Sequence, residues 1–261
     1  YDTLGSALFD AITELDEYYP TRTERAIFSA RDAEIAAAFG RTSCTLIDLG
    51  AGNGEKAARL FPVLRPREYV AIDISVEYLQ RSLEALQRRF PHIAMTGVGA
   101  DLGRPLELPA RLPREGRLFF YPGSSIGNLV PDEALRFLQG LRAHLDDTGA
   151  LLVGIDLAKD VATLEAAYDD PLGVTAAFNL NVLRHANRIA GTDFVLADWR
   201  HVAFFDATHA RIEMHLEARR AVRVSWPGGE RRFAAGERIH TEHSHKYRID
   251  EFAALLARAG F

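Results

Sequence analysis

The chain has 261 residues, of which 48% are hydrophobic and 26% charged, and its net charge of -5 argues against a nucleic-acid-binding protein, which normally carries a basic excess. No apolar run approaches the roughly 18 residues of a membrane span, and no secretory signal opens the sequence. The single cysteine, Cys44, excludes an intramolecular disulfide framework and is typical of a reducing cytoplasm, where we expect the protein to work.

Apolar runs and amphipathic segments alternate along residues 23–159. Thr23 is a plausible N-cap for the first helix. The expected strands cover residues 44–50, 67–75, 93–102, 117–129 with a glycine–serine turn at the end, and 150–157; the expected helices cover residues 23–39, 54–64, 76–91 and 131–145. This alternation predicts an α/β fold, a doubly wound parallel sheet of Rossmann-like type.

The pattern changes after residue 159. Residues 160–191 are mostly helical, and a final helix at 249–260 returns to the earlier style. Between them, antiparallel strands are expected at residues 201–207, 210–225 and 230–248, around the turn PGG. We therefore expect a second, α+β domain inserted after the fifth strand.

A glycine loop follows the first strand in LIDLGAGNGEK, where Asp48 precedes Gly50, Gly52 and Gly54. Glycines let the backbone turn tightly and let a ligand approach it, and ligands of parallel sheets bind at this edge. The spacing is G-x-G-x-G, without the third glycine of the dinucleotide-binding pattern. It is typical of S-adenosylmethionine (SAM)-dependent methyltransferases and disfavours a dehydrogenase.

Two acidic residues follow the next two strands. Asp73 ends the second strand, where a carboxylate can accept from both ribose hydroxyls, and Asp101 follows the third, near the expected adenine. The alternative is that both side chains only cap helices. Because three elements stand at successive strand ends, we favour a cofactor site made of the loop, Asp73 and Asp101.

Five segments resemble one family more specifically: GSALFDAITELDEYYPTRTE, YPGSSIGNL, AYDDPLGVTAAFNLNVL, RIEMHL and TEHSHKY. Together they resemble the histidine-specific Nα-methyltransferases of ergothioneine biosynthesis, which trimethylate the α-amino group of L-histidine to hercynine. The resemblance implies a substrate-binding domain of residues 1–22 and 160–246 and a SAM-binding methyltransferase domain of residues 23–159 and 247–261. It also implies a small-molecule partner, L-histidine, and we expect a monomer that binds neither nucleic acid nor membrane.

The resemblance implies roles for individual residues. Around the substrate amine and carboxylate it places Tyr18, Asn128 and Tyr168, and at the methyl-transfer site Tyr1, Phe9, Gly123 and Asn128. Around the substrate ring it places Met214, Glu242 and Ser244, and near the cofactor Tyr18 and Lys56. The chain begins inside the family's FYD segment and stops where this fold usually adds two strands, as a fragment would.

The stretch HTEHSHKYR, residues 240–248, contains three histidines. In a regular strand His240, Glu242, Ser244 and Lys246 would share one face, and His243 and His245 would point the other way, onto solvated surface. Each face then offers too few ligands for zinc, so no metal is expected. A carboxylate and a hydroxyl instead suit the two nitrogens of an imidazole.

Two alternatives remain for the function. The chain could methylate another amino acid, such as a tryptophan derivative, although a buried Glu242 without an N–H partner would then be costly. It could also be a catalytically silent SAM-binding module. Titration with candidate ligands followed by mass spectrometry of products separates these possibilities.

Overall fold

The computed structural model describes residues 2–40 and 43–261, which form two compact units. Unit 1 combines the segment that ends at Arg22 with Leu157–Tyr247, and unit 2 combines Thr23–Asp156 with Arg248–Phe261. Each unit is therefore assembled from two separate stretches of sequence. In the described part of the chain, no helix combines the length and the apolar character needed to cross a membrane.

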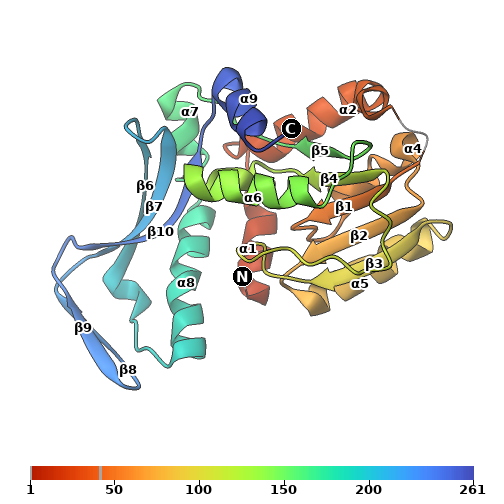
Figure 1. Ribbon diagram of the computed structural model, residues 1–261. Coiled ribbons are helices and arrows are strands. Elements are labelled where there is room, and N and C mark those ends of the chain that lie inside the picture. The colour runs from red at the N-terminus through yellow and green to blue at the C-terminus, as the bar shows by residue number, and fades with distance from the viewer. Residues whose placement is uncertain (1, 41–42) are drawn as a thin grey trace. The chain divides into compact units, whose positions relative to one another are not determined.

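Unit 2 is built on a five-stranded parallel sheet with the order β3-β2-β1-β4-β5 (Figure 1). Its strands are β1 (Thr45–Leu49), β2 (Glu68–Asp73), β3 (Ala94–Gly99), β4 (Arg117–Tyr121) and β5 (Ala150–Val153). β1 and β4 are buried along their whole length, as expected of central strands covered on both faces. The predicted α/β fold is confirmed, and the strand order reverses between β1 and β4, where ligands of such sheets bind.

Helices cover both faces of this sheet. They are α2 (Tyr19–Phe39), α3 (Glu55–Ala58), α4 (Phe61–Leu64), α5 (Val76–Arg89), α6 (Pro131–Ala143) and α9 (Ile249–Arg258), with a 3-10 turn η1 (Ser125–Asn128). On one face α2 to α5 form a core with Leu46, Tyr69 and Phe120. On the other, α6 places Phe137 with its ring 5.0 Å from that of Tyr121, and α9 packs on α6.

Two helix predictions for this unit were wrong in detail. Helix α2 begins at Tyr19, so Thr23 lies inside the helix and is not its N-cap. Pro20 suits a first helical turn, where its missing N–H has no intrahelical partner to lose. The single helix expected at residues 54–64 is divided into α3 and α4, with Pro62 in the first turn of α4, because proline cannot continue the preceding helix.

Unit 1 contains a three-stranded antiparallel sheet with the order β10-β7-β6 and a separate hairpin of β8 and β9. Its strands are β6 (Trp199–Asp206), β7 (Arg211–Ala218), β8 (Val222–Trp226), β9 (Gly229–Phe233) and β10 (Arg238–His245). Its helices are α1 (Thr3–Thr13), α7 (Val161–Ala166) and α8 (Val174–Ala190), with a 3-10 turn η2 (Leu196–Asp198). Helix α1 lies in a segment for which the sequence predicted no element, and it packs on α8.

The two faces of the β10-β7-β6 sheet differ in character. Ile212 and Met214 of β7 point into a core formed with α1, α7 and α8, on what we call the apolar face. Arg211, Glu213 and His215 alternate with them and define the polar face. The strand register therefore decides which side chains of β10 join the core and which join the polar face.

Candidate functional site

The glycine loop after β1 adopts a conformation that requires glycine. Gly50, Gly52 and Gly54 have φ values of 72°, 55° and 71°, in the left-handed region. A Cβ at Gly54 would lie 2.9 Å from the Tyr69 hydroxyl, whereas one at Gly52 would meet no atom within 4 Å. Gly54 thus allows close packing below the loop, and the space at Gly52 suits an approaching ligand. The loop fits a SAM-binding role.

Asp73 holds this loop in place. Its Oδ2 accepts from the backbone N–H of Gly52 at 3.0 Å and its Oδ1 from that of Ser75 at 2.9 Å. Each carboxylate oxygen has a second lone pair, so the side chain keeps acceptor capacity for ribose hydroxyls. Asp101 is exposed and accepts from the N–H of Gly103 at 2.9 Å, in a turn at which no helix begins.

Asp48 lies below the loop and does not face solvent. It is only 2% exposed, and its Oδ2 accepts from the Tyr69 hydroxyl at 2.7 Å. Burial raises the pKa of this carboxyl to about 7, with the Tyr69 hydrogen bond and the charge of Lys56 acting in the opposite direction. The cofactor role of Asp48 stays a prediction, and its buried position favours support of the loop from beneath.

Glu24 connects two predicted site residues, although the sequence did not single it out. Its Oε1 accepts from the backbone N–H of Gly123 at 2.5 Å, and its Oε2 lies 2.7 Å from the Lys56 Nζ. Gly123 and Ser124 have φ values of 75° and 56°, and a Cβ at Gly123 would lie 2.9 Å from the Lys56 Nζ. Glu24 is the last residue of EYYPTRTE, in a segment that carries the family resemblance, so the sequence did contain a signal for this residue.

Asn128 ends the 3-10 turn η1 and is exposed. The turn follows β4 at the carboxyl edge of the sheet, and the Ser124 hydroxyl accepts from the N–H of Asp156 at 2.8 Å. Gly123 and Asn128 thus both follow β4, with Asn128 farther from the end of the strand. Tyr1, the other residue expected at the methyl-transfer site, lies outside the described residues.

In unit 1 the predicted substrate residues gather on the apolar side of the sheet. The rings of Phe9 and Tyr18 are 6.3 Å apart and those of Tyr18 and Tyr168 are 6.1 Å apart, both edge to face. Met214 and Tyr168 are buried in one hydrophobic cluster, against which Tyr18 packs. Helix α1, the residue before α2, the turn after α7, and β7 thus supply neighbouring aromatic and thioether surface, which suits a flat ring.

A bulge at Thr241 changes the face on which His240 lies. In the pairing of β10 with β7, His240 is opposite His215, but Glu242 is opposite Met214, so one residue of β10 is left over between them. Glu242 and Ser244 therefore lie on the apolar side with Met214, as predicted. His240 joins the polar face, and the prediction that it shares a face with Glu242 was wrong.

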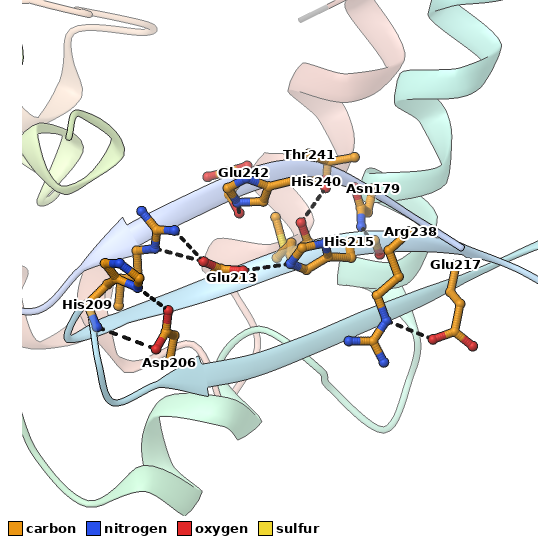
Figure 2. Close-up of polar contacts among 12 residues, drawn as sticks. Asn179, Asp206, His209, Glu213, His215, Glu217, Arg238, His240, Thr241 and Glu242 are labelled. Carbon is orange, nitrogen blue, oxygen red and sulfur yellow. Dashed lines mark hydrogen bonds and ion pairs between the residues drawn. The ribbon is translucent and has the colours of Figure 1, made fainter. Parts of the chain in front are cut away.

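The polar face carries a stacked group of side chains (Figure 2). His215 stacks between Phe204 and His240, at centroid distances of 5.3 and 4.8 Å, and its Nε2 lies 2.8 Å from Glu213 Oε2. Donor atoms of Glu213, His215 and His240 lie within 4.8 Å of one another, so the bulge assembles three possible metal ligands that regular alternation would separate. The guanidinium of Arg211 already forms an ion pair with Glu213. The rings of His215 and His240 are stacked, so their nitrogens do not point toward one common ion.

His243 and His245 do not both lie on the solvated surface. His245 is 7% exposed, and burial is the main cause that lowers its pKa to about 4. The His243 ring contacts the rings of both His240 and His245, with centroids 5.5 and 5.2 Å apart. The expectation of a solvated surface was therefore wrong for His245, which lies opposite Arg211 of β7 and packs against the His243 ring.

Glu242 and Ser244 have contrasting surroundings. Burial raises the pKa of Glu242 to about 7, with the charge of Lys246 acting in the opposite direction, and no described side chain donates a hydrogen bond to its carboxylate. The Ser244 hydroxyl lies 3.0 Å from the Tyr168 hydroxyl and 2.9 Å from the Lys246 Nζ. Lys246 was assigned no role from sequence, although it stands in the quoted segment TEHSHKY.

Comparison with known proteins gives consistent matches. The family model described as histidine-specific methyltransferase, SAM-dependent, matches residues 1–261. The histidine N-alpha-methyltransferase of Mycolicibacterium smegmatis is 43% identical over 267 residues, which cover 100% of this chain and 82% of that protein. Ergothioneine biosynthesis protein 1 of Neurospora crassa is 33% identical over 270 residues, covering 100% of this chain and 30% of that protein. A SAM-dependent methyltransferase structure from Clostridium acetobutylicum matches with a TM-score of 0.49 and 14% identity, covering 89% of this chain and 78% of that one.

Proposed function

Because the chain belongs to the family of histidine-specific, SAM-dependent methyltransferases, we propose that it trimethylates the α-amino nitrogen of L-histidine to give hercynine, the first step of ergothioneine biosynthesis. It is a SAM-dependent enzyme that methylates histidine. The observation that carries the substrate assignment is Glu242. A partly buried carboxylate to which no described residue donates a hydrogen bond is costly in the free protein, and an imidazole N–H would satisfy it.

The cofactor is proposed to bind at the carboxyl edge of the unit 2 sheet. SAM supplies an electrophilic methyl group on a sulfonium. The loop of Gly50, Gly52 and Gly54 offers close backbone approach, and Asp73 offers acceptors for the ribose hydroxyls. Asp101 is proposed to meet the adenine amino group. Lys56 carries the positive charge expected near the cofactor's carboxylate, and Glu24 fixes its position.

The substrate is proposed to bind through unit 1 and the turn after β4. Glu242 and Ser244 would hold the imidazole, Met214 would line the pocket of this ring, and Phe9 would shape the methyl-transfer site. Tyr18, Tyr168 and Asn128 would hold the amine and carboxylate. Unit 1 is in this proposal the substrate-binding domain and unit 2 the SAM-binding methyltransferase domain.

Positioning supplies most of the catalysis in this proposal. The amine must be neutral and must direct its lone pair at the methyl carbon in line with the bond to sulfur. Holding two reactants in this geometry can contribute about 7–11 kcal/mol. Conversion of an ammonium to a trimethylammonium group releases three protons, so the amine must reorient and lose a proton between transfers. Gly123, which has no side chain, leaves room for the growing substituent.

Mass spectrometry of the products tests the proposal. The enzyme is incubated with SAM and excess L-histidine, L-tryptophan or no amino acid until turnover ceases. We expect a trimethylated product from histidine alone. A product that stops at one methyl group would show that trimethylation is wrong, tryptophan turnover would support the alternative substrate, and SAM binding without any product would indicate a silent module.

The compartment and assembly state are also proposals. The thiol of Cys44 is free and buried, which suits the reducing cytoplasm expected from the sequence. We propose that the protein acts as a monomer on small-molecule substrates. Sedimentation at working concentration tests the second statement.

A further inference from the structure

Three buried polar groups form a closed triangle beside the proposed ring-binding residues. The Lys246 Nζ lies 2.9 Å from the Ser244 Oγ and 3.0 Å from the Tyr168 hydroxyl oxygen, and the two hydroxyl oxygens are 3.0 Å apart. Lys246, Ser244 and Tyr168 are 3%, 4% and 8% exposed. The ammonium also lies 4.8 Å from the centroid of the Tyr168 ring. Because the three groups are buried, each hydrogen bond of the triangle is electrostatically stronger than it would be in water.

Each hydrogen bond of this triangle has an assigned donor and acceptor. An ammonium has three donors and no acceptor, so Lys246 donates to both hydroxyl oxygens. The Tyr168 hydroxyl donates its hydrogen to the Ser244 oxygen. A serine hydroxyl has two lone pairs and one hydrogen, and both lone pairs of Ser244 are then occupied. Its own hydrogen remains, so Ser244 can meet a ligand only as a donor.

Glu242 presents the opposite character on the same side of the strand. It faces Met214 across the register, as Ser244 faces Ile212, and both partners belong to the apolar face. When ionised, its carboxylate accepts hydrogen bonds and cannot donate them. Glu242 and Ser244 therefore offer one acceptor and one donor, two positions apart along β10.

We propose that Lys246 is a specificity-determining positioning residue, which makes this site bind the substrate imidazole as a neutral ring in a single tautomer. The inference rests on the proposed function. A neutral imidazole has one N–H for Glu242 and one lone pair for Ser244. An imidazolium has two N–H groups, one of which would face the Ser244 hydrogen, and it would bring a second cation close to Lys246.

The protonation of the bound ring tests this directly. L-Histidine with both ring nitrogens labelled with ¹⁵N is bound to the enzyme with S-adenosylhomocysteine near pH 6, where much free histidine is protonated on the ring, and again at pH 8, above the pKa of about 7 of Glu242 in the free protein. We expect a nuclear magnetic resonance spectrum with one protonated and one unprotonated ring nitrogen. Two protonated nitrogens in the parent complex would overturn the inference. Absence of histidine binding would instead count against the proposed function.

The variant Lys246→Met tests the role of the lysine. It keeps an unbranched side chain but removes both donated hydrogen bonds, which frees Ser244 to accept. We expect the bound ring to become protonated at the same pH and histidine affinity to fall about tenfold. Retention of one neutral tautomer and of parent affinity would refute the role of Lys246.

Two further variants separate this effect from general damage. Lys159→Met replaces an exposed lysine of the same unit and should leave the spectrum of bound histidine as in the parent. If Lys246→Met does not fold, Tyr168→Phe removes a single donor to Ser244 and should produce the same change to a smaller extent. An unaltered ring spectrum in a folded Tyr168→Phe protein would contradict the donor count.

Discussion

Replacing Glu242 by glutamine should stabilise the ligand-free protein and weaken histidine binding. Burial raises the pKa of this carboxyl from 4.5 to about 7. A pKa above that of the unfolded chain means that its contribution to stability is complete below about pH 4 and is lost as pH rises through about 7. The full shift corresponds to about 3 kcal/mol, and solvent screening of a half-buried group reduces this to roughly 1–2 kcal/mol. At pH 8 the glutamine variant avoids this cost.

Binding should change in the other direction. A hydrogen bond to a charged acceptor contributes about 1.5–3 kcal/mol and a neutral one about 0.5–1.5 kcal/mol. Glu242→Gln should therefore weaken histidine binding roughly five- to twelvefold. Glu242→Ala removes the acceptor completely and should weaken binding at least about tenfold, with less discrimination against tryptophan.

Two measurements test both predictions for Glu242→Gln, and a control variant on the same strand accompanies them. Thermal unfolding of the ligand-free protein at pH 8 should show a melting temperature roughly 2–5 °C higher for Glu242→Gln, and little change at pH 4. Calorimetry in the presence of S-adenosylhomocysteine gives histidine affinity. The control, His240→Gln, changes the polar face and should leave histidine affinity intact. A glutamine variant that melts lower at pH 8, or binds histidine like the parent, would refute this reasoning.

Three further predictions concern the loops and the bulge. Asp73→Asn should weaken S-adenosylhomocysteine binding about tenfold, measured by calorimetry, since an amide is a poorer acceptor for ribose and for the Gly52 N–H; an unchanged affinity would exclude Asp73 as the ribose acceptor. Gly123→Ala should lower turnover more than histidine affinity, because its φ is 75° and its Cβ would lie 2.9 Å from the Lys56 Nζ; parent-like kinetics would contradict this. Deleting Thr241 should leave histidine binding largely intact in a protein with parent-like circular dichroism, because it removes the extra residue while His240 stays opposite His215 and Glu242 stays opposite Met214; lost binding in a folded protein would show that Glu242 reaches its place only through the bulge.

The sequence was most informative where the pattern is local. Strand and helix alternation and the G-x-G-x-G loop predicted the α/β sheet and the edge at which Asp73 lies. These features depend on residues close together in the chain, whose periodicity reports burial directly. The same reasoning located Glu242 and Ser244 on one side of β10, because the bulge precedes both of them.

Features that depend on distant partners were not visible in the sequence. The bulge at Thr241 follows from the register of β10 on β7, and alternation along one strand contains no information about an extra residue. Glu24 became notable only through the Gly123 N–H, which is 99 residues away. Lys246 became notable only through Tyr168, which is 78 residues away.

The division of each unit between early and late sequence has a consequence for biosynthesis. Helix α1 packs on α8, and the Asp2 carboxylate accepts from the Asn181 side chain at 2.7 Å, across 179 residues. At a translation rate of about 5–20 residues per second, α1 emerges from the ribosome roughly 8–30 s before its partner has been made. Its apolar side chains therefore remain accessible to chaperones while the strands of unit 2 are already being synthesised. Unit 1 can complete its fold only after α8 has been made, and the contact between α1 and α8 requires the closure of a long loop. We therefore expect the folding of unit 1 to be the slow step in producing active enzyme.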